Sequence, residues 1–148
     1  MRLTPRLAPI CLLWGLLLTA CSDGSSEPDP AEASLATLSG TVTYRERMAL
    51  PINAAVNVRL LDISVMDVPV RVLAEQNIDT QGKSVPIPYQ LEYDPAQVQE
   101  GLTYAVRAEI RSANGDLLWT TDTVHPVLTR DAPTDNVEIR VVRAGGRD

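Results

Sequence analysis

The side chains that most often carry catalysis are scarce in this sequence. His125 is the one histidine, and it stands beside Pro126 at the end of an expected strand. A hydrolytic triad needs a base beside a nucleophile, and a zinc site needs three or four ligands. Asp62 and Asp67 flank a short turn and could offer oxygen ligands to calcium, but they lack the D-x-[DN]-x-[DN]-G spacing. The sequence therefore predicts no catalytic residue, no metal site and no cofactor.

The first 20 residues have the composition of an export signal. Arg2 and Arg6 precede an apolar run from Leu7 to Leu18, and no acid occurs among them. The run is shorter than the roughly 20 apolar residues that a membrane-spanning helix needs. A basic start, a short apolar core and small residues at the end predict a cleaved signal peptide over residues 1–20. A retained N-terminal anchor is the alternative.

The stretch that ends this signal resembles a bacterial lipobox. It reads Leu18-Thr19-Ala20-Cys21, which implies that a signal peptidase recognises the first three residues and cuts before the cysteine. The Cys21 thiol would then carry a diacylglycerol, and its new amine an acyl chain. An ordinary signal peptide with a chance cysteine is the alternative. Ser22 resembles the default for outer-membrane delivery, so we expect a lipid-anchored protein on the periplasmic side of the outer membrane.

The segment that begins with this cysteine is rich in Ser, Pro and acids. Residues 21–36 contain no β-branched or aromatic side chain, so they predict a disordered tether. Once Arg2 and Arg6 are removed, 11 basic and 19 acidic residues remain. This acidic balance argues against nucleic acid as a partner and against electrostatic docking on anionic lipid.

After the tether, apolar residues recur at every second position, which is typical of half-buried strands. The longest alternation covers residues 85–93, and another places Val70, Val72 and Ala74 on one inward face. We expect seven strands, within residues 37–47, 53–64, 69–78, 84–93, 102–112, 117–128 and 136–142.

These strands predict an all-β fold, a single antiparallel β-sandwich over residues 37–144 with a disordered tail at 145–148. We expect an immunoglobulin-like or transthyretin-like arrangement, with a closed barrel as the alternative. Cys11 would leave with the signal, so the mature chain keeps one cysteine and no internal disulfide. The body is large enough to fold on burial alone.

Two prolines in the longest alternation bear on partner binding. Pro86 and Pro88 lie on the face opposite Val85 and Ile87. Proline cannot donate to a strand ladder, so this strand should lie at a sheet edge or contain a bulge. Such an edge could accept a partner strand. The alternative is that the prolines protect the edge from aggregation.

The segment "YRER" over residues 44–47 is the second candidate for partner binding. Arg45 and Arg47 would share one face of a strand. Two cations on one face could form a docking patch for a protein. The alternative is a solvated strand end with no partner.

The body resembles the YbaY/YscW-type family of small outer-membrane lipoproteins, known in part as type III secretion lipoprotein chaperones. The resemblance covers residues 38–129. It rests on the segments "LSGTVTYRERMALP", "VNVRLLDISVMDVPVRVLAEQNI", "GKSVPIPYQLEYD", "YAVRAEIRSANGDLLWTTD" and "PVLT". The "YRER" and "VPIPY" segments are family hallmarks, and no catalytic residue belongs to the pattern.

The resemblance implies a protein-binding role in the bacterial envelope. Some members of the family are pilotins, which bind a secretin subunit and help it to reach the outer membrane and assemble into a ring. The sequence therefore indicates a non-enzymatic module that binds another envelope protein. Two alternatives remain open at this point. One is a carrier of lipid or a small ligand, and the other is an inhibitor of an envelope-attacking hydrolase that presents loops at residues 111–116 and 129–135.

Overall fold

The computed structural model describes residues 34–145. The expected signal peptide, the lipidation site Cys21 with Leu18, Thr19 and Ala20, and the tether up to residue 33 lie outside the described residues, as do residues 146–148. The described part contains nine strands and one short 3-10 helix. These are β1 Ala36–Thr43, β2 Ala55–Asp62, β3 Arg71–Asp79, β4 Ile87–Tyr93, η1 Pro95–Gln97, β5 Tyr104–Arg111, β6 Leu117–Thr120, β7 His125–Val127, β8 Val137–Arg140 and β9 Val142–Arg143.

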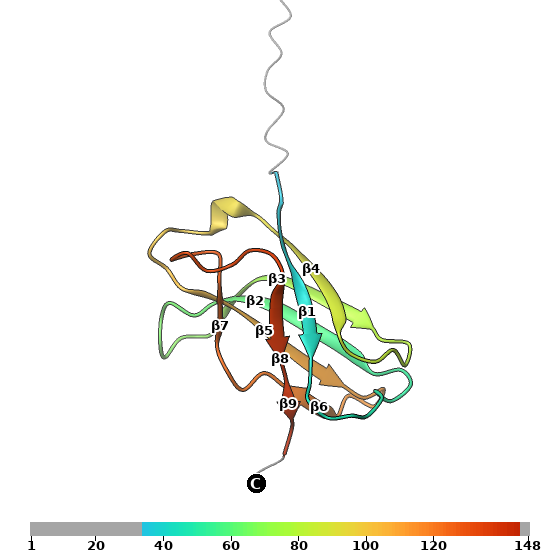
Figure 1. Ribbon diagram of the computed structural model, residues 1–148. Coiled ribbons are helices and arrows are strands. Elements are labelled where there is room, and N and C mark those ends of the chain that lie inside the picture. Colours follow the sequence, from blue (N-terminus) through green and yellow to red (C-terminus); the bar gives the residue numbers. More distant parts are fainter. Residues whose placement is uncertain (1–33, 146–148) are drawn as a thin grey trace, which may run out of the picture. The chain divides into compact units, whose positions relative to one another are not determined.

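The strands form two sheets that face each other across one core, which confirms the expected all-β sandwich (Figure 1). One sheet has the order β4-β1-β8, and we call it sheet A. The other has the order β3-β2-β5-β6-β9 with β7 also paired to β5, and we call it sheet B. The pairing is antiparallel except between β1 and β8, which run parallel. The expectation of a purely antiparallel sandwich is corrected at this pair.

The period-two pattern places its apolar side chains in the core where the sequence predicts them. In β4 the buried residues Ile87, Tyr89, Leu91 and Tyr93 alternate with exposed ones. The same alternation buries Val137 and Ile139 in β8. Val, Ile, Leu and Tyr side chains from both sheets form a single packed cluster. Burial of this apolar surface is the main contribution to the stability of the fold.

A short break divides one expected strand into β6 and β7, and Thr121 is the residue that bridges it. Its backbone N–H and its Oγ1 both donate to the carbonyl of Ala108, at 3.0 and 2.9 Å. The same Oγ1 accepts the Ala108 N–H at 2.7 Å. A side chain thus replaces part of the strand ladder, and the two residues that follow it bulge away from β5.

Thr121→Val should therefore destabilise the domain, although its shape changes little. Thr121 is 4% exposed, so the substitution leaves a buried Ala108 N–H without its acceptor. An unsatisfied buried donor costs about 1–3 kcal/mol. Urea unfolding of the two proteins measures this difference in the free energy of unfolding. Thr120→Val, at the half-buried neighbouring position, is the control and should cost much less.

The second break turns one expected strand into β8 and β9, which belong to different sheets. β8 pairs with β1 in sheet A, and after Val141 the chain crosses to sheet B, where β9 pairs with β6. The Val141 N–H donates to the carbonyl of Thr43 at 2.9 Å, and Val141 itself is buried. One continuous run therefore closes this side of the sandwich.

The edge strands of the two sheets, β3 and β4, lie beside each other on the other side of the sandwich. They are joined by a side chain, because the Gln90 N–H of β4 donates to Oε1 of Gln76 in β3 at 2.8 Å. No β3–β4 ladder is formed between them. The arrangement is therefore a sandwich and not a closed barrel.

The two ends of the sandwich carry different loops. At one end, which we call the N-terminal end, Ala36 of β1 pairs with Tyr93 of β4. The loops at residues 63–70, 94–103 and 128–136 share this end, since Arg71 bonds to Gln97 and Arg130 to Gly101. The loops at residues 44–54, 80–86 and 112–116 gather at the opposite end, which we call the far end.

The predicted inward face of residues 70–74 is wrong for two of its three members. Val70 and Val72 are 50% and 45% exposed, whereas Ala74 is partly buried against the core. A register shift explains the difference: Leu60 pairs with Ala74, but the next residue, Leu61, pairs with Val72. The resulting bulge at the start of β3 turns Val70 and Val72 away from the core.

Candidate functional site

The "YRER" segment follows β1 and turns back across the far end of the sandwich. Tyr44 is buried, and its ring stacks on that of Trp119 with 4.9 Å between the ring centroids. Its hydroxyl donates to the carbonyl of Met48 at 2.6 Å, which closes the turn. Burial, and secondarily the Glu46 carboxylate, raise the pKa of Tyr44 above its ordinary value, so this hydroxyl stays a donor. Tyr44 thus anchors the segment.

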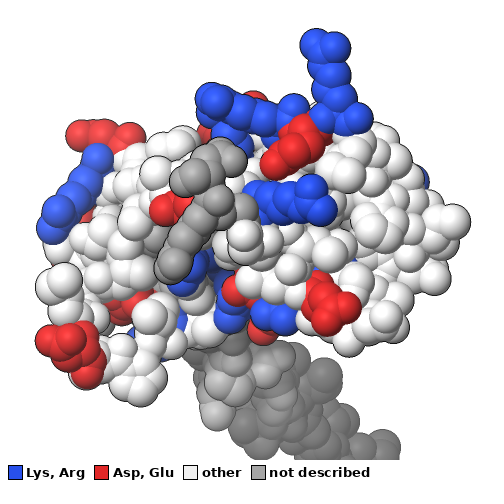
Figure 2. Space-filling view, turned by 90° about the horizontal axis from the view of Figure 1, so that it is seen from below, with Lys and Arg blue, Asp and Glu red and all other residues white. Residues whose placement is uncertain are grey.

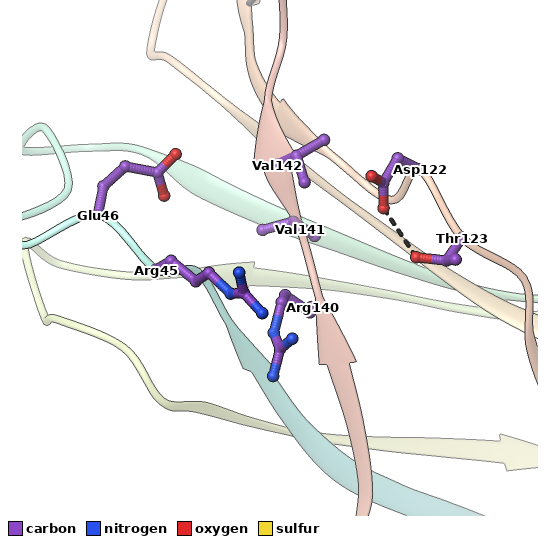
Figure 3. A pocket seen from close by; sticks show the side chains of 7 residues that line it. All are labelled: Arg45, Glu46, Asp122, Thr123, Arg140, Val141 and Val142. Carbon is purple, nitrogen blue, oxygen red and sulfur yellow. Dashed lines mark hydrogen bonds between the residues drawn. The ribbon is translucent and has the colours of Figure 1, made fainter.

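The anchored turn displays one of its arginines into a pocket of about 300 Å³. We call it the arginine pocket, and its lining residues are Arg45, Glu46, Asp122, Thr123, Arg140, Val141 and Val142. The residues come from the turn after β1, the break between β6 and β7, and the crossing from β8 to β9. In Figure 3 the guanidinium groups of Arg45 and Arg140 lie on one side and Asp122 on the other.

The charges of the arginine pocket are only partly neutralised by one another. Among the described residues Arg45 forms no ion pair, and Arg140 forms only a long one, 3.6 Å, with the exposed Glu138. Asp122 accepts a hydrogen bond from Thr123 Oγ1 at 2.8 Å. The Oε2 atom of Glu46 is buried without a hydrogen-bond partner. The Arg45 guanidinium, with Arg140 held only by a long contact to Glu138, suits a carboxylate, which such groups can hold through paired N–H donors.

The second predicted arginine lies apart from this site. Arg47 is exposed and does not line the pocket. Sequence reasoning found Arg45 but missed Arg140, because the two are 95 residues apart and only the parallel pairing of β1 with β8 brings them together. No local pattern signals that pairing.

Pro86 and Pro88 lie at the start of the edge strand β4, as the sequence predicts for prolines. Both are exposed, and they line a small groove of about 140 Å³ with Thr80, Lys83 and Ser84. Pro88 pairs with Thr41, so its missing N–H faces away from β1, toward the free edge. The next outward donor, the Gln90 N–H, is already bound to Gln76. The free edge of β4 therefore offers few donors for a partner strand.

The charges of the described residues are distributed unevenly between the two ends. The acids Asp67, Asp94, Glu100, Asp131 and Asp135 belong to loops of the N-terminal end. The far end carries most of the cations, namely Arg45, Arg47, Lys83, Arg111, Arg140 and Arg143. Figure 2 views the molecule from the side of the far end and shows blue side chains gathered along its upper margin. The far end also carries the acids Glu46, Asp79, Asp116 and Glu138, so its charges are mixed, with a small excess of cations.

No group of three or more His, Cys, Asp or Glu side chains within residues 34–145 could hold a metal ion. His125 lies in β7, where its Nε2 is buried and has no hydrogen-bond partner in the described structure. Within the same residues, no helix is long and apolar enough to span a membrane.

Comparison with known proteins decides the family. The model of the type III secretion system lipoprotein chaperone YscW matches residues 33–139, which is more than half of the chain. The chain belongs to the YscW family. The match covers β1 to β7 and most of β8, and it ends before the crossing and β9. The uncharacterized lipoprotein YbaY of Escherichia coli (strain K12) is 32% identical over 153 residues, with 88% of this chain and 80% of that protein covered.

A solved structure extends the family likeness to the fold. An alternative pilotin from the type II secretion system of Vibrio cholerae superimposes with a TM-score of 0.68 at 38% sequence identity. The likeness covers 74% of this chain and 99% of that one. Arg45 and Asp122 lie within the part that matches the YscW family, whereas Arg140 follows it by one residue. The arginine pocket thus straddles the boundary of the family match.

Proposed function

We propose that this protein is a lipid-anchored, non-enzymatic chaperone of the outer membrane that binds a component of a secretion system, as a pilotin does. The observation that carries the proposal is the likeness to the type II secretion pilotin, which extends over 99% of that protein. At 38% identity the likeness concerns the sequence as well as the fold. Membership of a lipoprotein chaperone family supports the same role.

The anchor in this proposal is Cys21. Acylation of its thiol and amine would fix the chain to the periplasmic side of the outer membrane, and Leu18, Thr19 and Ala20 would direct the peptidase to it. As the disordered tether that the sequence predicts, the residues between Cys21 and β1 would have a root-mean-square reach of roughly 20 Å and a limit of about 50 Å. The sandwich therefore stays close to the membrane while its far end remains accessible to a partner.

The binding surface in this proposal is the far end with its arginine pocket. Arg45 and Arg140 would hold an acidic side chain or a terminal carboxylate of the partner, and the pocket volume of about 300 Å³ leaves room for one such group. The surrounding cations would attract an acidic segment and accelerate its association. The packed core supports protein binding over a ligand carrier, because the inward side chains of both sheets form one contiguous cluster.

Cross-linking in the membranes of the native host tests both the partner and the site. A tagged, lipidated protein should recover a secretin or another ring-forming outer-membrane protein in stoichiometric amount. The double variant Arg45→Glu/Arg140→Glu should recover at least about fivefold less of it, because like charges at an interface repel the partner. The matched control is Arg130→Glu, which changes a cation at the N-terminal end and should leave recovery unchanged.

The two parts of the proposal fail in different ways. Full recovery by the double variant would remove the arginine pocket from the interface but keep the partner. An eluate without any secretion component, from membranes in which the tagged protein is present, would remove the chaperone function itself.

A further inference from the structure

Five of the ten large apolar side chains that are exposed in the described structure gather in one segment. It connects β2 to β3, and together with the start of β3 we call residues 63–72 the apolar hairpin. Met66 is 86% exposed, and Val65 is 63% exposed. The other members are Val68, Val70 and Val72, each 45–52% exposed. Isolated exposed apolar residues are common, but a contiguous group of this kind marks a surface that something covers.

The apolar surface continues from the hairpin onto the outer face of sheet B. Val72 pairs with Leu61, Leu61 with Ala105, and Ala105 with Pro126, which gives an apolar row across four strands. Leu61 and Ala105 do not belong to the core cluster between the sheets, although they are 4% and 2% exposed. Nearby Val124 is 62% exposed. Leu61 and Ala105 are thus already covered within the domain, and the exposed apolar surface is that of the hairpin itself together with Val124.

The hairpin belongs to the end of the sandwich at which the chain enters β1. Its base is tied to η1 by the bond from Arg71 to Gln97, and η1 directly follows Tyr93, the partner of Ala36. The tether would thus join a membrane-bound Cys21 to the end that bears the exposed apolar side chains. We propose that the apolar hairpin inserts into the lipid surface to which the protein is anchored, and so holds the far end outward. This inference rests on the lipid anchor of the proposed function.

The charges around the hairpin suit a lipid surface at this one place. Arg71 stands at its base, and Arg107 is exposed two residues beyond the apolar row, where both can reach lipid phosphates while the valines lie deeper. Asp67 is the acid of the turn itself. Asp62 ends β2 at the base of the hairpin, where it pairs with Arg71 across the strands and is partly balanced by that cation. The other acids of the loops at this end lie at residues 94–103 and 128–136. Contact is therefore confined to the hairpin.

The length of the tether would allow the hairpin to reach the bilayer. Tethering also lowers the membrane affinity that the hairpin itself needs. A flexible chain of roughly 20 Å reach keeps the hairpin at high local concentration near the bilayer. A few valines and one methionine bind a membrane only weakly by themselves, whereas a second signal beside a lipid anchor is effective. The acyl chains would thus attach the protein, and the hairpin would orient the sandwich relative to the membrane.

A fluorescent probe on single cysteines tests the insertion in the full, lipidated protein. Met66→Cys and Ile52→Cys each introduce one free thiol, because Cys21 carries lipid and Cys11 leaves with the signal. Ile52 is the matched control, since it is 79% exposed, apolar, and lies in the loop at the far end. Both proteins are labelled with an environment-sensitive dye in their own membranes and titrated with aqueous iodide and with nitroxide-bearing phospholipid.

We expect the probe at residue 66 to emit at shorter wavelength, to be quenched by the nitroxide lipid, and to be quenched about threefold less by iodide than the probe at residue 52. An insertion depth of about 5–10 Å accounts for these differences. Equal behaviour of the two probes would overturn the proposal. Protection from iodide without quenching by the lipid would also overturn it, since a protein would then cover the hairpin. Failure of the lipid anchor is detected separately. The mature protein would then lack the mass of the acyl chains, and the free thiol of Cys21 would also be labelled by the dye.

Discussion

Cys21→Ala should abolish incorporation of palmitate and remove the protein from the outer membrane. The thiol is the only atom in the expected motif that can receive the diacylglycerol, so no other residue can replace it. A single acyl chain binds a bilayer only reversibly, with a constant of about 10⁴ M⁻¹, whereas several chains on one residue hold a protein essentially permanently. The variant should therefore lose nearly all of its outer-membrane population. Labelled palmitate and separation of the membranes by density measure both effects.

The chain supplies its own control for this prediction. Cys11→Ala changes the other cysteine, ten residues earlier in the apolar run of the signal. It should leave palmitate incorporation and membrane location unchanged. If Cys21→Ala still carries palmitate, or if both variants stay in the outer membrane, the lipobox interpretation is wrong.

Gly40→Ala should be the most destabilising single substitution in sheet A. Gly40 lies in β1 between β4 and β8, and a Cβ atom there would come within 2.0 Å of the Val137 carbonyl oxygen and 2.8 Å of the Tyr89 hydroxyl. The Val137 oxygen also accepts a hydrogen bond from that hydroxyl at 3.2 Å. The methyl group can be accommodated only if β8 moves away from β1. We expect a loss of about 3 kcal/mol or more in the free energy of unfolding.

Urea unfolding followed by the fluorescence of Trp119 measures this loss in the mature protein. Gly101→Ala is the matched control, because nothing lies within 4 Å of its added Cβ atom, but its φ of +91° disfavours alanine. That substitution should cost only about 1–2 kcal/mol. Gly40 has no such positive φ, so a loss no larger than that of Gly101→Ala would show that β1 and β8 accommodate the added methyl group despite the close approach of Val137.

Much of the sandwich could be predicted from residue patterns. The strict alternation around Tyr89 predicts a strand with one buried face, and Pro86 and Pro88 predict that this strand lies at an edge or contains a bulge. The structure places β4 at the edge of sheet A. The strands β6 and β7 were expected as one, because Thr121 fits an alternating pattern. In the structure the Thr121 hydroxyl replaces backbone hydrogen bonds of the ladder by bonding to Ala108, and sequence alone does not show this contact.

The surface was harder to predict than the core. Val70 and Val72 look like inward residues, since alternation cannot reveal a bulge in the pairing with β2. The pairing of Arg45 with Arg140 in one pocket depends on a parallel contact between the first strand and the eighth. Long-range topology decides such juxtapositions, whereas local periodicity decides which residues are buried.

In the export that we propose for this protein, the crossing from β8 to β9 bears on the timing of folding. A chain that leaves the cytoplasm with its N-terminus first can pair β1 with β4 and β2 with β5 early. Sheet A lacks its third strand, and sheet B its β9 edge, until residue 143 has emerged. Pairing between segments about 100 residues apart is also slow to form. The domain would thus stay incompletely folded, and able to pass a narrow translocation channel, until nearly all of it has reached the periplasm.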